Sequence, residues 1–115
     1  MSNKELTFLE AEEILKQIKL HTPREDADLL ENMEKKAIRY VRFRSDWAFM
    51  TPPEKAEADE DRTSAHNSFI TALSMLARLH GSRADEWTTM LDMSDRKRVG
   101  DFACWLTAII AIRQR

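Results

Sequence analysis

The chain has 115 residues, the length of one modest domain, and its formal net charge of −2 excludes a general electrostatic attraction to nucleic acid or anionic lipid. Hydrophobic residues make up 43% and charged residues 33%, a balance that excludes an intrinsically disordered chain. Only two glycines and three prolines occur, which excludes a turn-rich β-sandwich or barrel and favours helices.

Capping patterns mark the starts of the first helices. Thr7 and Glu10 have the spacing of a capping box and predict a helix over residues 8–20. Thr22-Pro23-Arg24-Glu25 has the same pattern with proline at the first helical position, and it predicts a second helix over 23–48. Thr51-Pro52-Pro53-Glu54 predicts a third helix over 53–80, which Arg62-Thr63-Ser64 could break.

The last third of the chain continues the helical pattern. Gly81 predicts the end of the third helix, and a short helix is expected over 83–91. Ser94-Asp95 predicts the start of a last helix over 95–113, with Asp95 well placed on the helix dipole. Because no segment alternates with period two, we expect one all-α domain over residues 1–115, a bundle of four to five helices.

The last helix is apolar on two sides. One stripe contains Val99, Phe102, Leu106, Ile109 and Ile110; the other contains Trp105, Ala108 and Ile112, with Arg98 and Asp101 at its polar end. A helix of this kind is central in the fold or covered by a partner. Gly100 inside it predicts the close approach of another helix.

A polar set forms the candidate ligand-binding site: Arg62, His66, Asn67, Asp95 and Asp101. His66 is either a proton carrier or ligand oriented by Asp95 or Asp101, or a core histidine that hydrogen bonds satisfy. We expect Asp101 to bond to Arg98, Arg62 or His66 and to clamp two helices together.

Motifs for metal, cofactor or covalent chemistry are weak. Glu10-x-x-Glu13 and Glu31-x-x-Glu34 are similar to the magnesium-binding pattern of all-α nucleotide pyrophosphatases, but the last residue is Glu rather than Asp. The spacing of the three histidines predicts no zinc site, and one cysteine, Cys104, excludes a disulfide and a Cys-based cluster. We therefore expect no catalytic residue, no metal and no cofactor.

Two segments, "DRTSAHNSFITALSMLARL" and "DRKRVGDFACWLTAIIAIR", resemble a family of small all-α bacterial proteins, often from Gram-positive hosts and mobile elements, catalogued as a domain of unknown function. The resemblance covers the C-terminal half and includes the Trp-bearing connection "SRADEWTTMLDMS". It centres on Arg62, His66, Asn67 and Phe69, and on Asp95, Arg96, Gly100, Asp101 and Phe102. It implies an all-α fold, a bacterial origin and contact between the two segments, and it carries no activity.

The leading hypothesis is a non-enzymatic helical protein that binds another protein, first of all a second copy of itself. Its candidate interface residues are Phe43, Trp47, Phe49, Trp105 and Ile112. A small enzyme or ligand binder around His66 and Asp101 is the alternative.

A nucleic-acid-binding accessory protein that uses Lys35, Arg39, Arg42, Arg96 and Lys97 is a further alternative. The N-terminus has no apolar run of a secretory signal, and the longest apolar run is about half of the ~20 residues that cross a bilayer. We therefore expect a cytoplasmic protein without a membrane span.

Overall fold

The computed structural model describes residues 5–114, and this range contains five α-helices, two short 3-10 turns and no strand. The helices are α1 (Phe8–His21), α2 (Ala27–Trp47), α3 (Pro52–His80), α4 (Asp85–Leu91) and α5 (Arg96–Arg113), and the 3-10 turns are Arg24–Asp26 and Gly81–Ala84. The predicted all-α fold is confirmed.

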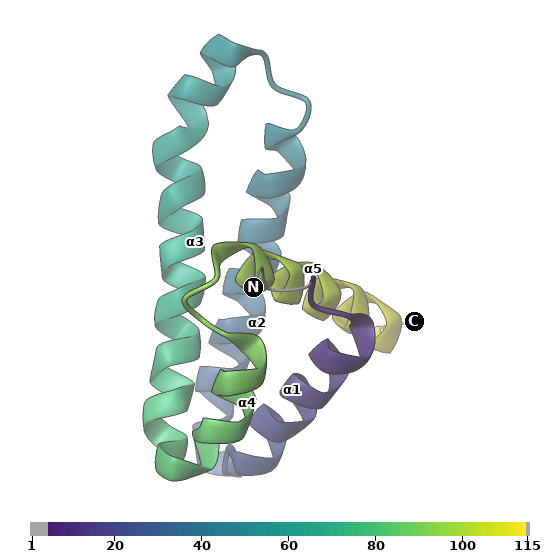
Figure 1. Cartoon of the computed structure of the whole chain (residues 1–115), viewed down its shortest axis with the longest axis vertical. Helices are drawn as coiled ribbons and strands as arrows, with labels where there is room; N and C mark the ends of the chain where they lie inside the picture. Colours follow the sequence, from purple (N-terminus) through teal and green to yellow (C-terminus); the bar gives the residue numbers. More distant parts are fainter. Residues whose placement is uncertain (1–4, 115) are drawn as a thin grey trace.

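The antiparallel hairpin of α2 and α3 organises the molecule (Figure 1). Its far end, around the turn between the two helices, extends beyond the other elements. α5 crosses the hairpin and packs on α2, while α1 packs on α4 and α5. Two ends of the molecule therefore differ: a broad end with all the helices and a narrow end that only the hairpin forms.

Two of the predicted capping boxes are present. Thr7 Oγ1 accepts from the Glu10 amide at 3.1 Å, and Glu10 Oε1 accepts from the Thr7 amide at 3.0 Å. Thr51 and Glu54 make the same reciprocal pair at the start of α3. Asp95 caps α5 by accepting from the amides of Lys97 and Arg98. These starts follow the local pattern because a cap needs only residues within one turn.

The predicted cap at Thr22 is wrong. Its hydroxyl donates to the Ile18 carbonyl at 2.6 Å, at the end of α1, and the following residues 24–26 form a 3-10 turn instead of the first turn of α2. The hydroxyl is therefore occupied by the preceding helix. The break expected at Arg62 is also wrong, because α3 runs without interruption to Gly81, which ends it at φ 62° as predicted.

The core is built from one face of each helix. Phe69 of α3 and Phe102 of α5 stack with ring centroids 6.2 Å apart, so the two segments of the proposed resemblance do meet. Trp87 of α4 is fully buried with them. On α2 the buried residues are Met33, Ala37 and Tyr40, whereas Ala48, one residue beyond the end of the helix, is exposed. Within residues 5–114 no helix has the length and apolar character needed to cross a membrane.

Candidate binding surfaces

The predicted ligand-binding residues do not meet in one pocket. Asn67 lines an open polar groove of about 480 Å³ between α2 and α3, and Asp101 lines a separate hollow beside Leu6 and Trp105. Asp95 is the cap of α5. Of the predicted set, Arg62, His66 and Asn67 remain close to one another, all within about one and a half turns of α3.

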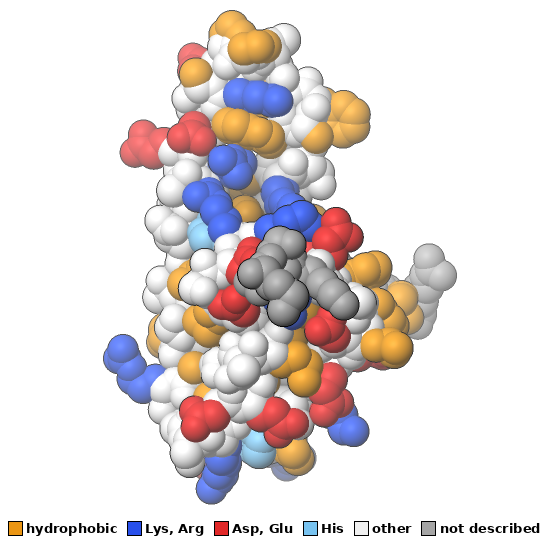
Figure 2. Space-filling view, in the orientation of Figure 1, with side chains coloured by type: hydrophobic (Ala, Val, Ile, Leu, Met, Phe, Trp, Pro, Cys, Tyr) orange, Lys and Arg blue, Asp and Glu red, His pale blue; other side chains and the backbone are white. Residues whose placement is uncertain are grey.

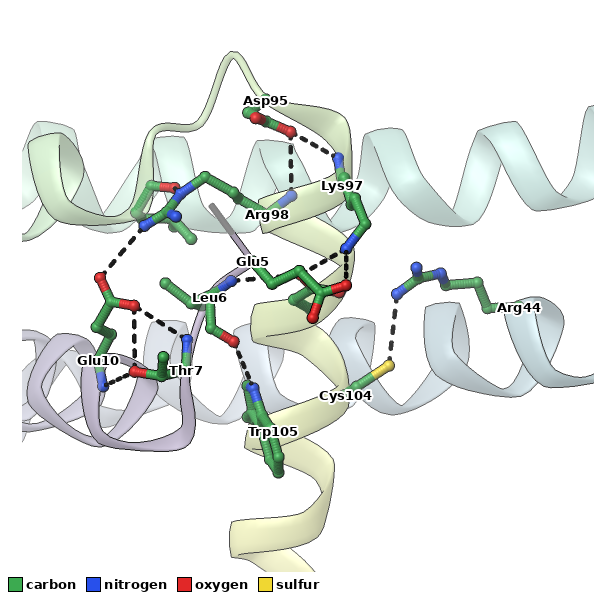
Figure 3. Close-up of polar contacts among 12 residues, drawn as sticks. Glu5, Leu6, Thr7, Glu10, Arg44, Asp95, Lys97, Arg98, Cys104 and Trp105 are labelled. Atoms are coloured by element: carbon green, nitrogen blue, oxygen red, sulfur yellow. Dashed lines mark hydrogen bonds and ion pairs between the residues drawn. The ribbon is translucent and has the colours of Figure 1, made fainter. Parts of the chain in front are cut away.

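Asp101 is a clamp, but the predicted partners are wrong. Figure 3 shows the neighbouring side chains of Lys97 and Trp105 on either side of Leu6. Oδ2 of Asp101 accepts from the Leu6 amide and from Lys97 Nζ, both at 3.4 Å. One turn later, Trp105 Nε1 donates to the Leu6 carbonyl at 2.9 Å. The two side chains thus hold both backbone polar groups of Leu6, and the clamp joins α5 to the segment before α1 rather than to α3. The sequence could not indicate this, because the partner is a backbone 95 residues away.

A buried histidine relay is the polar feature that the sequence did not indicate. Trp87 Nε1 donates to His80 Nδ1 at 3.1 Å, so neutral His80 carries its proton on Nε2, which lies 2.8 Å from Thr22 Oγ1. That hydroxyl in turn donates to the Ile18 carbonyl. Burial first, and then the nearby His21 and Arg83, hold the pKa of His80 below its usual range. The relay ties the end of α3 to α4 and to the end of α1.

His66 is surrounded by cationic and aromatic groups instead of the expected carboxylate. Its ring lies edge-on to Tyr40 with centroids 5.2 Å apart, and Nδ1 lies 3.3 Å from Asn67 Oδ1. Burial is the main cause that lowers the pKa of His66, and the positive charges of Arg96 and Arg62 lower it further. The hydrogen bond with Asn67 acts in the opposite direction and raises the pKa. Its Nε2 is buried without a hydrogen-bond partner in the described part of the chain. Within the described residues, hydrogen bonding therefore satisfies Nδ1 of His66 and leaves Nε2 without a partner.

Positive side chains gather around His66 where the hairpin meets the start of α5 (Figure 2). Arg62 lies over the Trp47 ring at 4.3 Å and pairs with Asp59 at 3.4 Å. Arg44 of α2 packs on Gly100 of α5, which has no side chain to obstruct it. The close approach expected at Gly100 is thus made by a side chain. We call Arg44, Arg62 and Arg96 the arginine cluster.

The predicted interface residues separate into two regions. Phe43 and Trp47 are half-buried on α2 under Arg39 and Arg62, and Phe49 is 91% exposed at the hairpin turn. Trp105 and Ile112 lie on the second stripe of α5, beside α1.

Large apolar side chains stay exposed where α1 and α5 lie side by side. We call them the α1–α5 surface; its members are Leu9, Leu20, Trp105 and Ile112. Figure 2 shows hydrophobic side chains over this part of the molecule. A hollow between the two helices is lined by Leu15 and Ile109 and rimmed by Glu12, Lys16 and Lys19.

Several of the remaining charged candidates are engaged in separate ion pairs. Lys35 pairs with Glu31, and Lys97 pairs with Glu5 and Asp101, where the Glu5 hydrogen bond is the main cause that raises the pKa of Lys97. Glu10 and Glu34 pair with Arg98 and Arg113. Over residues 5–114, no group of three or more His, Cys, Asp or Glu side chains is arranged to hold a metal ion.

Comparison with models of known families, with curated proteins and with solved structures finds no match to this chain. The proposed family resemblance therefore stays a prediction.

Proposed function

We propose that this chain is a non-enzymatic protein-binding module that pairs with a second copy of itself through the α1–α5 surface. The observation that carries the proposal is the exposure of large apolar side chains on adjoining helices: Leu9 73%, Leu20 71%, Ile112 60% and Trp105 37%. Large contiguous apolar patches are uncommon on monomers and mark interaction sites.

The charges at the edge of the surface support a second copy as the occupant. Glu12 lies on the same edge as Lys16 and Lys19, so the edge carries both signs. In a two-fold interface the same patch faces itself, and a patch with both signs can then pair each charge with its opposite. Trp105 supports the same assignment, because its Nε1 is already bonded to Leu6 and its ring is an apolar anchor. The free thiol of Cys104 fits a reducing compartment, and we propose the cytoplasm.

Light scattering on surface variants tests this function. The wild-type chain should have twice its 13.4 kDa mass, and Ile112→Glu and Leu9→Glu should each shift it to the monomer, because they place a charge inside the apolar contact. Phe49→Ser is the matched control, since Phe49 is 91% exposed at the hairpin turn, away from this surface. A wild-type mass of 13.4 kDa at every concentration would contradict the proposal, as would a dimer that only Phe49→Ser dissociates.

A further inference from the structure

The arginine cluster brings three positive charges from three helices to one place. Tyr40, Arg44 and Trp47 are spaced four and three residues apart, so they share one side of α2. On that side Tyr40 contacts His66 and Trp47 contacts Arg62, so the Arg44 position is flanked by both α3 side chains.

α5 supplies the third arginine. Gly100 adjoins the Arg44 guanidinium so closely that an added Cβ would lie 2.6 Å from Nη1. Arg96 is one turn before Gly100 on the same side of α5, and its charge is near enough to lower the pKa of His66. The cluster therefore surrounds the place where α2, α3 and α5 meet.

The cluster has too little negative charge and too few hydrogen-bond acceptors of its own. Within the described residues Arg62 pairs with Asp59, which is itself 58% exposed, while Arg44 and Arg96 have no ion-pair partner. The polar contact of Arg44 is a weak one, from Nη1 to Cys104 Sγ at 3.5 Å. Arg62 Nε and His66 Nε2 are buried without partners in the same range. Unpaired buried polar atoms and crowded like charges both destabilise the protein, and a bound oxyanion would relieve both.

We propose that Arg44, Arg62 and Arg96 bind the phosphate group of a small phosphorylated molecule. Guanidinium groups suit this ligand because their planar N–H pairs match two phosphate oxygens at once. His66 Nε2 lies unpartnered beside the cluster and, when protonated, donates a further hydrogen bond. Asp59, which pairs with Arg62 on α3, would repel a continuous nucleic-acid strand that ran along this helix, and this favours a small ligand.

Titration of the full-length chain with pyrophosphate at constant ionic strength, followed by calorimetry and by NMR, tests this site. We expect saturable binding that shifts the His66 ring signals. Arg96→Gln and Arg62→Gln should each weaken it about tenfold or more, the loss of one charge-assisted contact. Gly100→Ala should weaken it without removing any charge, because the new methyl group displaces Arg44. Arg42→Gln is the control, since Arg42 is exposed on the opposite side of α2.

Three kinds of outcome would overturn the proposal. The first is the absence of saturable binding by the wild-type chain, or equal weakening by Arg42→Gln and Arg96→Gln. The second is binding of a short single-stranded oligonucleotide without binding of pyrophosphate, which would indicate a nucleic-acid surface. The third is equal binding of citrate at the same residues, which would indicate a carboxylate ligand. Arg96 is exposed, so Arg96→Gln keeps the test valid if Arg62→Gln does not fold.

Discussion

Arg98 of α5 joins two further helices, α4 and α1, and Figure 3 shows its side chain beside Glu10 of α1. Its Nε donates to the Leu91 carbonyl at 3.1 Å and its Nη2 to the Met90 carbonyl at 2.6 Å, so it satisfies the end of α4 from within α5. The same guanidinium lies 3.6 Å from Glu10 of α1. A buried cation with these contacts fixes the relative positions of three helices.

Arg98→Ala should therefore destabilise the fold by about 3 kcal/mol, since it leaves helix-end carbonyls and a carboxylate without their partner. The expected fall in melting temperature is on the order of 10 °C for a chain of this size. Arg98→Lys keeps the charge but cannot reach two carbonyls at once. Its melting temperature should therefore lie between those of the wild-type chain and Arg98→Ala. Melting temperatures of Arg98→Ala and the wild-type chain that agree would contradict this role.

The lowered pKa of His80 predicts how the free energy of unfolding depends on pH. In the folded chain this pKa is below the ordinary value of 6.5, so the unfolded chain binds the proton of His80 more readily. The contribution of neutral His80 to the stability of the fold is therefore complete above pH 6.5. It is lost as the pH falls from 6.5 through the pKa of His80 in the folded chain. The pKa of His66 is shifted in the same direction and adds to the loss.

Urea unfolding at pH 7.5 and pH 5.5 measures this effect. The wild-type chain should lose on the order of 1 kcal/mol of unfolding free energy between the two, and His80→Gln should lose less because it does not titrate. An NMR titration that puts the His80 pKa at or above 6.5 would rule this explanation out.

For the helices, the sequence predicts the starts that residues within one turn determine, and it misses the contacts that distant segments determine. The starts of α1, α3 and α5 follow from caps within four residues. The cap at Thr22 failed because an upstream carbonyl and a histidine 58 residues away occupy its hydroxyl. The sequence named His66 and Arg62 as candidates, whereas the approach of Arg44 and Arg96 to them depends on how α2 and α5 cross, which no local pattern encodes.

The segment before α1 is held to α5 through hydrogen bonds to the backbone of Leu6. Asp101→Ala removes the acceptor for the Leu6 amide and one partner of Lys97, and we expect a loss of about 1 kcal/mol. Hydrogen exchange of the Leu6 amide should become faster in this variant. Asp101→Asn keeps an oxygen at that position and should retain most of the protection. Unchanged Leu6 exchange in Asp101→Ala would show that the clamp is absent in solution.

In the molecule as a whole, α5 contributes to two distinct surfaces because it lies across the hairpin. One side of α5 faces Arg44 and contributes Arg96 and Gly100 to the arginine cluster. Another side contributes Trp105 and Ile112 to the α1–α5 surface. The two-sided apolar pattern read from the sequence thus corresponds to one stripe in the core and one at the surface.

The most direct test of self-association is an isotope-filtered NMR experiment on a mixture of labelled and unlabelled copies, which detects contacts between copies alone. Self-association through the α1–α5 surface predicts such contacts from the methyl groups of Ile112 and Leu9, and none from the ring of Phe49 at the hairpin turn. A spectrum with no contacts between copies at the concentration of the experiment, or with contacts only from Phe49, would contradict it.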